Sequence, residues 1–180
     1  MEDVKDMQQF GVIGLSVMGK NLALNVRNHG FSVSGFSIDK SEVDAFAKYE
    51  DDKLKPCYTW EEFVNSLEKP RKILIQIMAG DPVDQTLQKL LPLLDKGDIL
   101  IDGGNSNYHD TNRRFHEMEK HGIHFIGMGV SGGEEGALNG PALMPGGDEP
   151  AYKEVAPILE AIAAKNTEGK PCVYYMGPEG

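Results

Sequence analysis

The sequence predicts an α/β fold built on an open, mostly parallel sheet. Short apolar runs rich in Val, Ile and Phe alternate with longer amphipathic stretches. The stretches between the runs have the length that a crossover between parallel strands requires. Strands are expected over residues 10–13, 32–37, 72–77, 99–102, 124–127 and 173–176.

Helix start signals follow several of these strands. Thr59 and Glu62 have the spacing of a capping box. Asp81 followed by Pro82 is typical of an N-cap and a first helical position, so a helix is expected to begin there. Apolar side chains recur at helical spacing in two further stretches, residues 18–28 and 41–49.

The composition indicates one acidic globular domain. The chain has 180 residues, and 28 acidic against 18 basic side chains give a formal charge of −10. Nucleic acid is not an expected partner, because proteins that bind it present basic surfaces. Residues 1–9 are polar and are expected to form a flexible extension, with one domain over residues 10–180.

The signal-peptide pattern, the hydropathy and the cysteines indicate the cellular compartment. The first nine residues resemble no signal peptide, and no run of 18 apolar residues follows, so no membrane contact is expected. Cys57 and Cys172 lie far apart and fit free thiols in a reducing compartment. We expect a cytoplasmic protein.

A glycine loop follows the first expected strand, where open α/β sheets bind their ligands. Its glycines predict a tight turn and close packing of the next helix on the strand, and the helix N-terminus supplies free N–H donors for a pyrophosphate. A strand-to-helix turn without a ligand is the alternative. The loop consists of Gly14, Leu15, Ser16, Val17, Met18 and Gly19.

The second strand ends at Ser37, Ile38 and Asp39. An acid at this place usually accepts from the ribose hydroxyls of NAD, whereas Arg or small polar groups suit the 2′-phosphate of NADP. Neither pattern is complete here. Asp39 fits a ribose contact and the N-cap of the next helix equally well.

Two later loops predict an anionic substrate. Asp102 is followed by Gly103, Gly104 and Asn105, and residues 129–136 are rich in glycine. Paired glycines let successive N–H groups converge on an anion, and an Asn amide both donates and accepts. Turns that need glycine for backbone geometry alone are the alternative. No metal is expected, because His116 and His121 would lie on different faces of one helix.

Four stretches together resemble the coenzyme-binding domain of decarboxylating 6-phosphogluconate dehydrogenase. They are GLSVMGKNLALN (14–25), ILIDGGNS (99–106), GVSGGEEGA (129–137) and GPALMPGG (140–147). The DGGN and SGGEEGA motifs are specific, whereas the glycine loop also occurs in related 3-hydroxyacid dehydrogenases. The resemblance implies a doubly wound Rossmann-like fold. It also implies an enzyme of the pentose phosphate pathway that oxidises 6-phosphogluconate with NADP and releases CO2 and ribulose 5-phosphate.

The resemblance also implies a role for each matching residue. The expected cofactor contacts are Gly14, Leu15, Ser16, Val17, Met18, Gly19, Ser37, Ile38, Asp39, Ile77, Met78, Ala79 and Asn105. The expected substrate contacts are Asn105, Ser131, Gly132 and Gly133.

Two departures from the family pattern change what is expected. The family commonly shows Asn-Arg-Thr where Ser37, Ile38 and Asp39 stand, and apolar Ile38 cannot pair a 2′-phosphate. We predict weakened NADP binding and a relaxed or NAD-leaning choice. The family also places its catalytic Lys and Glu on a helix after a turn similar to residues 177–180. We therefore expect no catalytic residue and no helical C-terminal domain in this chain.

On this interpretation the chain alone is inactive, and the full-length protein is a homodimeric enzyme. Two alternative functions also fit the sequence. One is a self-sufficient nucleotide-binding module without turnover, which a natural stop codon after Gly180 would favour. The other is a related 3-hydroxyacid dehydrogenase, which turnover of a small 3-hydroxy acid would reveal.

Overall fold

The computed structural model describes residues 6–179, and its elements alternate along the chain. The strands are β1 (Phe10–Ile13), β2 (Val33–Phe36), β3 (Leu54–Cys57), β4 (Lys72–Ile75), β5 (Ile99–Asp102), β6 (His124–Ser131) and β7 (Ala142–Gly147). The helices are α1 (Val17–Asn28), α2 (Lys40–Ala47), α3 (Trp60–Asn65), α4 (Asp81–Leu90), α5 (Tyr108–Glu119), α6 (Gly133–Asn139) and α7 (Glu149–Ile162), with a 3₁₀ turn η2 (Leu91–Leu93) after α4.

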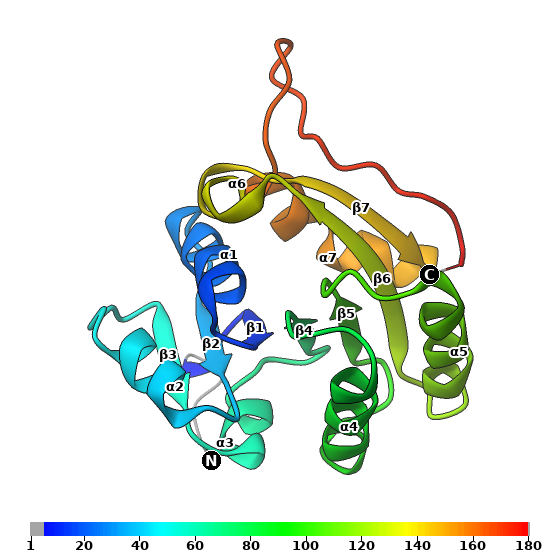
Figure 1. Cartoon of the computed structure of the whole chain (residues 1–180), viewed down its shortest axis with the longest axis horizontal. Coiled ribbons are helices and arrows are strands. Elements are labelled where there is room, and N and C mark those ends of the chain that lie inside the picture. The colour runs from blue at the N-terminus through cyan, green and yellow to red at the C-terminus, as the bar shows by residue number, and fades with distance from the viewer. Residues whose placement is uncertain (1–5, 180) are drawn as a thin grey trace.

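The strands form one sheet in the order β3-β2-β1-β4-β5-β6-β7. Every neighbouring pair is parallel except β6 and β7, which are antiparallel. The chain runs from β1 outward to β3, then returns to β4 and runs outward the other way (Figure 1). This confirms the predicted doubly wound α/β fold, and the carboxyl ends of β1 and β4 meet at the point where the strand order reverses.

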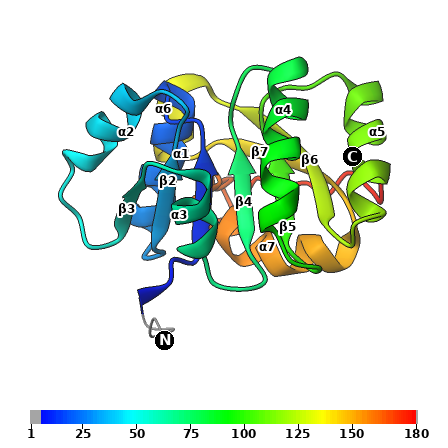
Figure 2. The same cartoon turned by 90° about the horizontal axis from the view of Figure 1, so that it is seen from below.

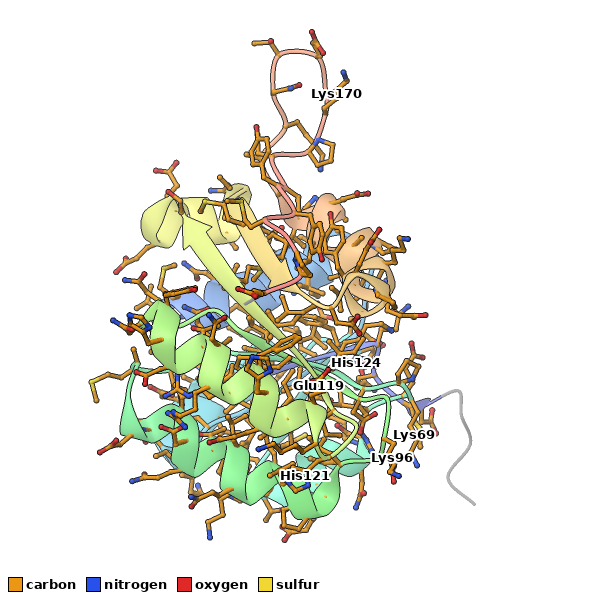
Figure 3. All side chains as sticks on the ribbon, turned by 90° about the vertical axis from the view of Figure 1, so that its right-hand side faces the viewer. Lys69, Lys96, Glu119, His121, His124 and Lys170 are labelled. Carbon is orange, nitrogen blue, oxygen red and sulfur yellow. The ribbon has the colours of Figure 1, made fainter. Side chains whose placement is uncertain are left out.

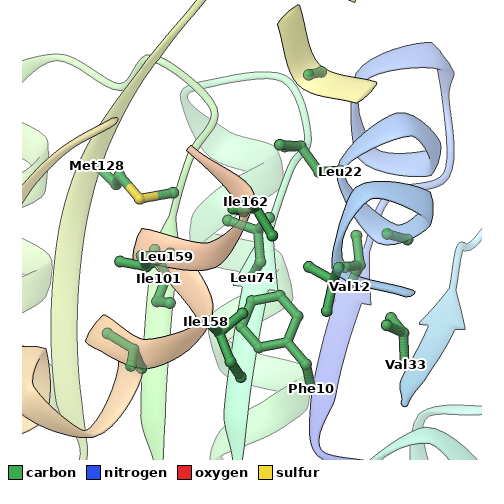
Figure 4. Packing of buried hydrophobic residues seen from close by; sticks show 14 of the residues in the cluster. Phe10, Val12, Leu22, Val33, Leu74, Ile101, Met128, Ile158, Leu159 and Ile162 are labelled. Carbon is green, nitrogen blue, oxygen red and sulfur yellow. The ribbon is translucent and has the colours of Figure 1, made fainter. Parts of the chain in front are cut away.

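Helices cover both faces of the sheet (Figures 1 and 2). One face packs against α1, α2, α6 and α7, and Figure 4 shows part of this core, where Phe10 and Val12 of β1 lie near Ile158 and Ile162 of α7. The other face packs against α3, α4 and α5. Successive residues of β4 alternate between the two cores, Leu74 in the first and Ile73 in the second, as strand geometry requires.

The two ends of the parallel strands differ in character. Charged side chains gather at the amino ends, where Lys69, Lys96 and His124 lie close to the starts of β4, β5 and β6 (Figure 3). Glycine-rich loops leave the carboxyl ends instead. A separate loop bearing Lys170 projects from the body of the molecule (Figure 3).

Most predicted strands are confirmed, but two strands were missed and one prediction was wrong. Residues 173–176 form only an isolated bridge from Val173 to Leu143. The N–H groups of Tyr174 and Met176 do bond to carbonyls of β7, but Pro145 has no N–H to donate in return, so no continuous strand forms. The missed strands are β3 and β7, which carry Pro56 and Pro145. Pro56 is tolerated because β3 is an edge strand that pairs with β2 alone.

The predicted caps are partly confirmed. Thr59 Oγ1 accepts a hydrogen bond from the N–H of Glu62 at 3.1 Å, as the capping box predicted. The prediction for Asp81 was wrong by one position, because Gly80 is the N-cap of α4 and Asp81 and Pro82 follow it. Of the expected extension, residues 1–5 lie outside the described residues, and Gln8 forms a backbone bridge to Leu67.

Candidate nucleotide-binding site

The glycine loop joins β1 to α1 with backbone packed against backbone. A Cβ on Gly19 would lie 1.8 Å from the carbonyl oxygen of Gly14, so any larger residue would separate the helix from the strand. Gly14 has a φ of +93°, and a Cβ there would meet the carbonyl of Gln76, which follows β4. The two glycines therefore perform the structural roles expected of them and bring the loops after β1 and β4 together.

The N-terminus of α1 faces out of this loop without a side-chain cap. Ser16 is the N-cap, and its hydroxyl makes no capping hydrogen bond. Ser16 and Val17 are exposed, whereas Leu15 is buried in the core and offers only its backbone. Free N–H groups at a helix N-terminus carry a partial positive charge and suit a pyrophosphate.

The end of β2 presents one apolar and two polar residues. Ile38 is 85% exposed, and Ser37 is buried. Asp39 is the N-cap of α2, where its carboxylate accepts from the N–H of Ser41 at 2.9 Å and from the Ser41 hydroxyl. These hydrogen bonds lower the pKa of Asp39. Of the two predicted roles for Asp39, the structure shows the cap.

Glu42 is a residue of this region that the sequence analysis missed. Its Oε2 accepts from the Ser37 hydroxyl at 2.6 Å and from the N–H of Leu15 at 3.2 Å. The Glu42 side chain thereby links the end of β2 to the glycine loop. In the sequence Glu42 is indistinguishable from an ordinary acid in the first turn of a helix, so no signal there separates the two roles.

Two cavities lie on either side of the loop after β4. One of about 690 Å³ is mostly apolar and is lined by Gly14, Ser37, Ile38, Trp60, Ile77 and Met78 together with residues of α4. The other, of about 390 Å³, is lined by Ser16, Met18, Gln76, Ile77, Met78, Gly103, Gly104, Asn105 and Val130. Predicted cofactor residues from four loops are thus brought together. Five others lie outside both lining sets: Leu15, Val17, Gly19, Asp39 and Ala79.

The turn after β5 is packed against the loop after β4. A Cβ on Gly104 would lie 2.3 Å from the carbonyl oxygen of Ile77. Asp102 is buried and accepts from the N–H of Gly104 at 3.0 Å and from the Ser106 hydroxyl at 2.5 Å. Asn105 stands in the chain between Gly104 and Ser106, the two residues that bond to Asp102, and has a φ of +59°. It is held at the mouth of the second cavity.

A buried arginine that the sequence analysis missed bonds to the loops after β4 and β5. Arg114 of α5 is fully buried and pairs with Asp84 of α4 through two hydrogen bonds of 2.9 and 3.0 Å. It also donates to the Gly80 carbonyl and to Ser106, and it lies 3.7 Å from Asp102. Hydrogen bonds from Arg114, and secondarily from a neighbouring arginine, lower the pKa of Asp84 to about 2.

The residues expected to hold the substrate fall into two places. Asn105 lines the second cavity and a third one of about 440 Å³ with Gly129 and Met144. Ser131, Gly132 and Gly133 lie further along β6 and at the start of α6, exposed and outside these lining sets. The expectation of one long loop over residues 129–136 was wrong, because β6 continues to Ser131 and pairs with β7 before α6 begins.

Two absences apply to residues 6–179. No group of three or more His, Cys, Asp or Glu side chains is placed to hold a metal ion. None of the helices in this part combines the length and the apolar character needed to cross a bilayer.

The reversal of strand order, the glycine loop and the cavities define a dinucleotide-binding domain of the Rossmann-like class. Residues 9–177 match the family model described as the NAD binding domain of 6-phosphogluconate dehydrogenase. The chain belongs to this family.

The relatives agree in name and in extent. A decarboxylating 6-phosphogluconate dehydrogenase of Staphylococcus aureus (strain Mu50) is 60% identical over 174 residues, which are 96% of this chain. The NADP(+)-dependent, decarboxylating 6-phosphogluconate dehydrogenase of Bacillus subtilis (strain 168) is 58% identical over 96% of this chain. In both cases the chain spans 37% of the length of the relative.

Solved structures give the same fold. A Plasmodium falciparum 6-phosphogluconate dehydrogenase, studied with its cofactor NADP+ and its substrate 6-phosphogluconate, matches with a TM-score of 0.89 and 39% identity. The match covers 95% of this chain and 37% of that one. A 3-hydroxyisobutyrate dehydrogenase of Salmonella typhimurium matches with a TM-score of 0.78 over 96% of this chain and 57% of that one, but at 20% identity it shows the fold alone.

Proposed function

We propose that this chain binds a nicotinamide dinucleotide, NADP or NAD, and serves as the coenzyme-binding part of a 6-phosphogluconate dehydrogenase. One observation carries the proposal: the loops after β1, β4 and β5 meet at the reversal point of the sheet, backbone against backbone, around cavities that predicted cofactor residues line. The reaction of the whole enzyme yields ribulose 5-phosphate and CO2.

In this proposal each loop holds one part of the ligands. Residues 14–19 bind the pyrophosphate at the N-terminus of α1, and residues 37–39 lie beside the adenosine. Ile77, Met78 and Ala79 lie against the nicotinamide. Asn105 contacts both cofactor and substrate, and Ser131, Gly132 and Gly133 hold the sugar acid.

The residues present fit such a cofactor. The first cavity is mostly apolar and suits an adenine ring, and the uncapped end of α1 offers N–H donors to phosphate oxygens. A bound nicotinamide would supply the acceptor for the hydride that leaves C3 of the sugar acid. The chain's own residues bind and orient both ligands, and we assign proton transfer to none of them. We also propose that the whole protein is a cytoplasmic homodimer, which sedimentation would test.

Calorimetric titration of the chain with NADP, NAD and 6-phosphogluconate tests the proposal. Ser16→Asp supplies the sharpest variant, because Asp is a good N-cap and leaves α1 stable while its charge opposes the pyrophosphate. We expect nucleotide affinity to fall about a hundredfold, roughly 2.7 kcal/mol. Thr167→Asp adds the same charge at an exposed turn between Lys165 and Pro171 and should leave affinity unchanged. Absence of nucleotide binding by the folded unaltered chain would refute the proposal.

A further inference from the structure

The carboxylate of Glu42 bridges the end of β2 and the glycine loop. Glu42 belongs to the first turn of α2 and is half-buried. Its Oε2 is bonded to the Ser37 hydroxyl at the end of β2 and to the N–H of Leu15 in the glycine loop. These are the two segments between which a doubly wound domain holds the ribose.

We propose that Glu42 accepts hydrogen bonds from the ribose hydroxyls and makes this site select NAD over NADP. The inference rests on the proposed function and names the cofactor of that same site. In dinucleotide-binding domains an acid about 20 residues beyond the glycine loop commonly accepts from the ribose 2′-hydroxyl. Glu42 lies at a similar separation, but it reaches the site from α2, whereas the acid usually ends β2.

The hydrogen bonds of Glu42 leave it able to take up a ribose. Among the described residues, both polar contacts of its carboxylate use Oε2. Oε1 is therefore left to accept from a ribose hydroxyl, while Ser37 and Leu15 hold the side chain in place. A carboxylate is an acceptor only, which matches hydroxyl donors and opposes a phosphate.

The surrounding charges oppose a 2′-phosphate. Asp39 adds a second carboxylate at the end of β2, and the neighbouring Ile38 contributes no charge. Lys40 is occupied, because its Nζ lies 3.0 Å from Asp44 and 5.5 Å from the centre of the Tyr58 ring. Lys89 of α4 also lines the cavity, and it is the one cation of that lining available to offset this repulsion.

Glu42 has a second effect, since an acid in the first turn of a helix is favourable to the helix dipole. Substitution of Glu42 by Gln separates its two effects on the ligand, which are hydrogen bonding to the ribose and repulsion of the 2′-phosphate. Gln at this position still accepts hydrogen bonds through its carbonyl oxygen but has no charge. Glu42→Gln therefore tests repulsion of the 2′-phosphate, and Glu42→Ala tests the bonds to the ribose.

The experiment is calorimetric titration of the 180-residue chain and its variants with NAD and NADP. We expect the unaltered chain to bind NAD at least about tenfold more tightly than NADP. Glu42→Gln should improve NADP binding about tenfold with little change for NAD, and Glu42→Ala should weaken NAD binding about tenfold. Glu154→Gln removes one charge from the exposed surface of α7 and should change neither affinity.

Further measurements assign any change to the ribose. Adenosine 2′,5′-bisphosphate and AMP differ only at the 2′-position, and Glu42→Gln should improve binding of the former alone. Thermal melts verify that each variant is folded.

The outcomes separate the two proposals. If the unaltered chain binds NADP more tightly, or if Glu42→Gln leaves the ratio of the two affinities unchanged, the role of Glu42 is refuted while the dinucleotide site stands. A preference for NADP that disappears in Lys89→Gln would assign selection to Lys89 instead and refute Glu42. If the folded chain binds neither nucleotide, the proposed function itself fails.

Discussion

The loops on the two sides of the reversal point are held in different ways. On the β5 side, Asp102 and Arg114 are buried and bonded to other protein groups, so the turn that carries Asn105 is held from within. On the β2 side, Ile38 is exposed and lines the first cavity, and the half-buried Glu42 bonds to Ser37 and Leu15. The side expected to position the reacting groups is therefore held by buried charged groups, and the side expected to hold the adenosine by exposed and half-buried ones.

This difference has an energetic meaning. A buried ion pair cannot lose one partner without leaving an uncompensated charge, so changes on the β5 side affect the fold. Exposed residues change with little effect on stability, so changes on the β2 side should affect ligand choice more than stability. The comparison therefore predicts that stability and nucleotide selection are controlled by different residues.

Asp84→Asn should have the largest effect on stability. The substitution leaves the fully buried Arg114 with only the more distant carboxylate of Asp102, at 3.7 Å. Breaking a fully buried pair costs about 3 to 5 kcal/mol, and because Asp84 is partly exposed we expect about 3 kcal/mol. Asp39→Asn on the β2 side keeps a good N-cap and should change stability by less than about 0.5 kcal/mol. Urea unfolding of both variants measures the difference, and equal effects would contradict the comparison.

Gly19→Ala should be nearly as damaging, because the added methyl would meet the Gly14 carbonyl. We expect a loss of about 2 to 3 kcal/mol in the free energy of unfolding, together with weaker nucleotide binding. Gly136→Ala is the matched control in α6, where a Cβ would have its first neighbour at 3.9 Å. It should stabilise by about 0.5 to 1 kcal/mol.

Acid should weaken the pairing that supports the β5 side. The pKa of Asp84 falls from 3.8 to about 2 on folding, mainly through hydrogen bonds from Arg114. A lowered pKa contributes stability above the unfolded value, and this contribution is lost as the pH falls from about 4 to about 2. The loss is about 2 kcal/mol at most. Unfolding across this pH range should show a step that is absent from Asp84→Asn; an unchanged step in that variant would assign it to other carboxylates.

The parts predicted from the sequence are those encoded by neighbouring residues. The apolar runs of β1 and β5, the Thr59 cap and the packing roles of Gly14 and Gly19 depend on local patterns, and the structure confirms them. The missed strand β7 contains Pro145 and three small residues, so its assignment depends on pairing with β6.

The unpredicted part of the site depends on distant contacts. Arg114 reads as an ordinary helical arginine until α4 lies beside it and supplies Asp84, 30 positions away. Glu42 has no recognisable role until β1 and β2 pair and place Leu15 near it. The roles of Arg114 and Glu42 can therefore be recognised only from the folded structure.

Ile38→Arg should have the smallest effect on stability and sharpens the comparison most directly. Ile38 is 85% exposed, so its replacement should leave the free energy of unfolding within about 0.5 kcal/mol. A guanidinium beside the ribose supplies bidentate donors for a 2′-phosphate, and we expect NADP affinity to rise about tenfold, roughly 1.4 kcal/mol. Ile38→Gln, which lacks the charge, should produce little gain. Combining Ile38→Arg with Glu42→Gln should raise NADP affinity further, because the first substitution adds attraction and the second removes repulsion. An effect no larger than that of either substitution alone would mean that the two residues do not act on the same phosphate.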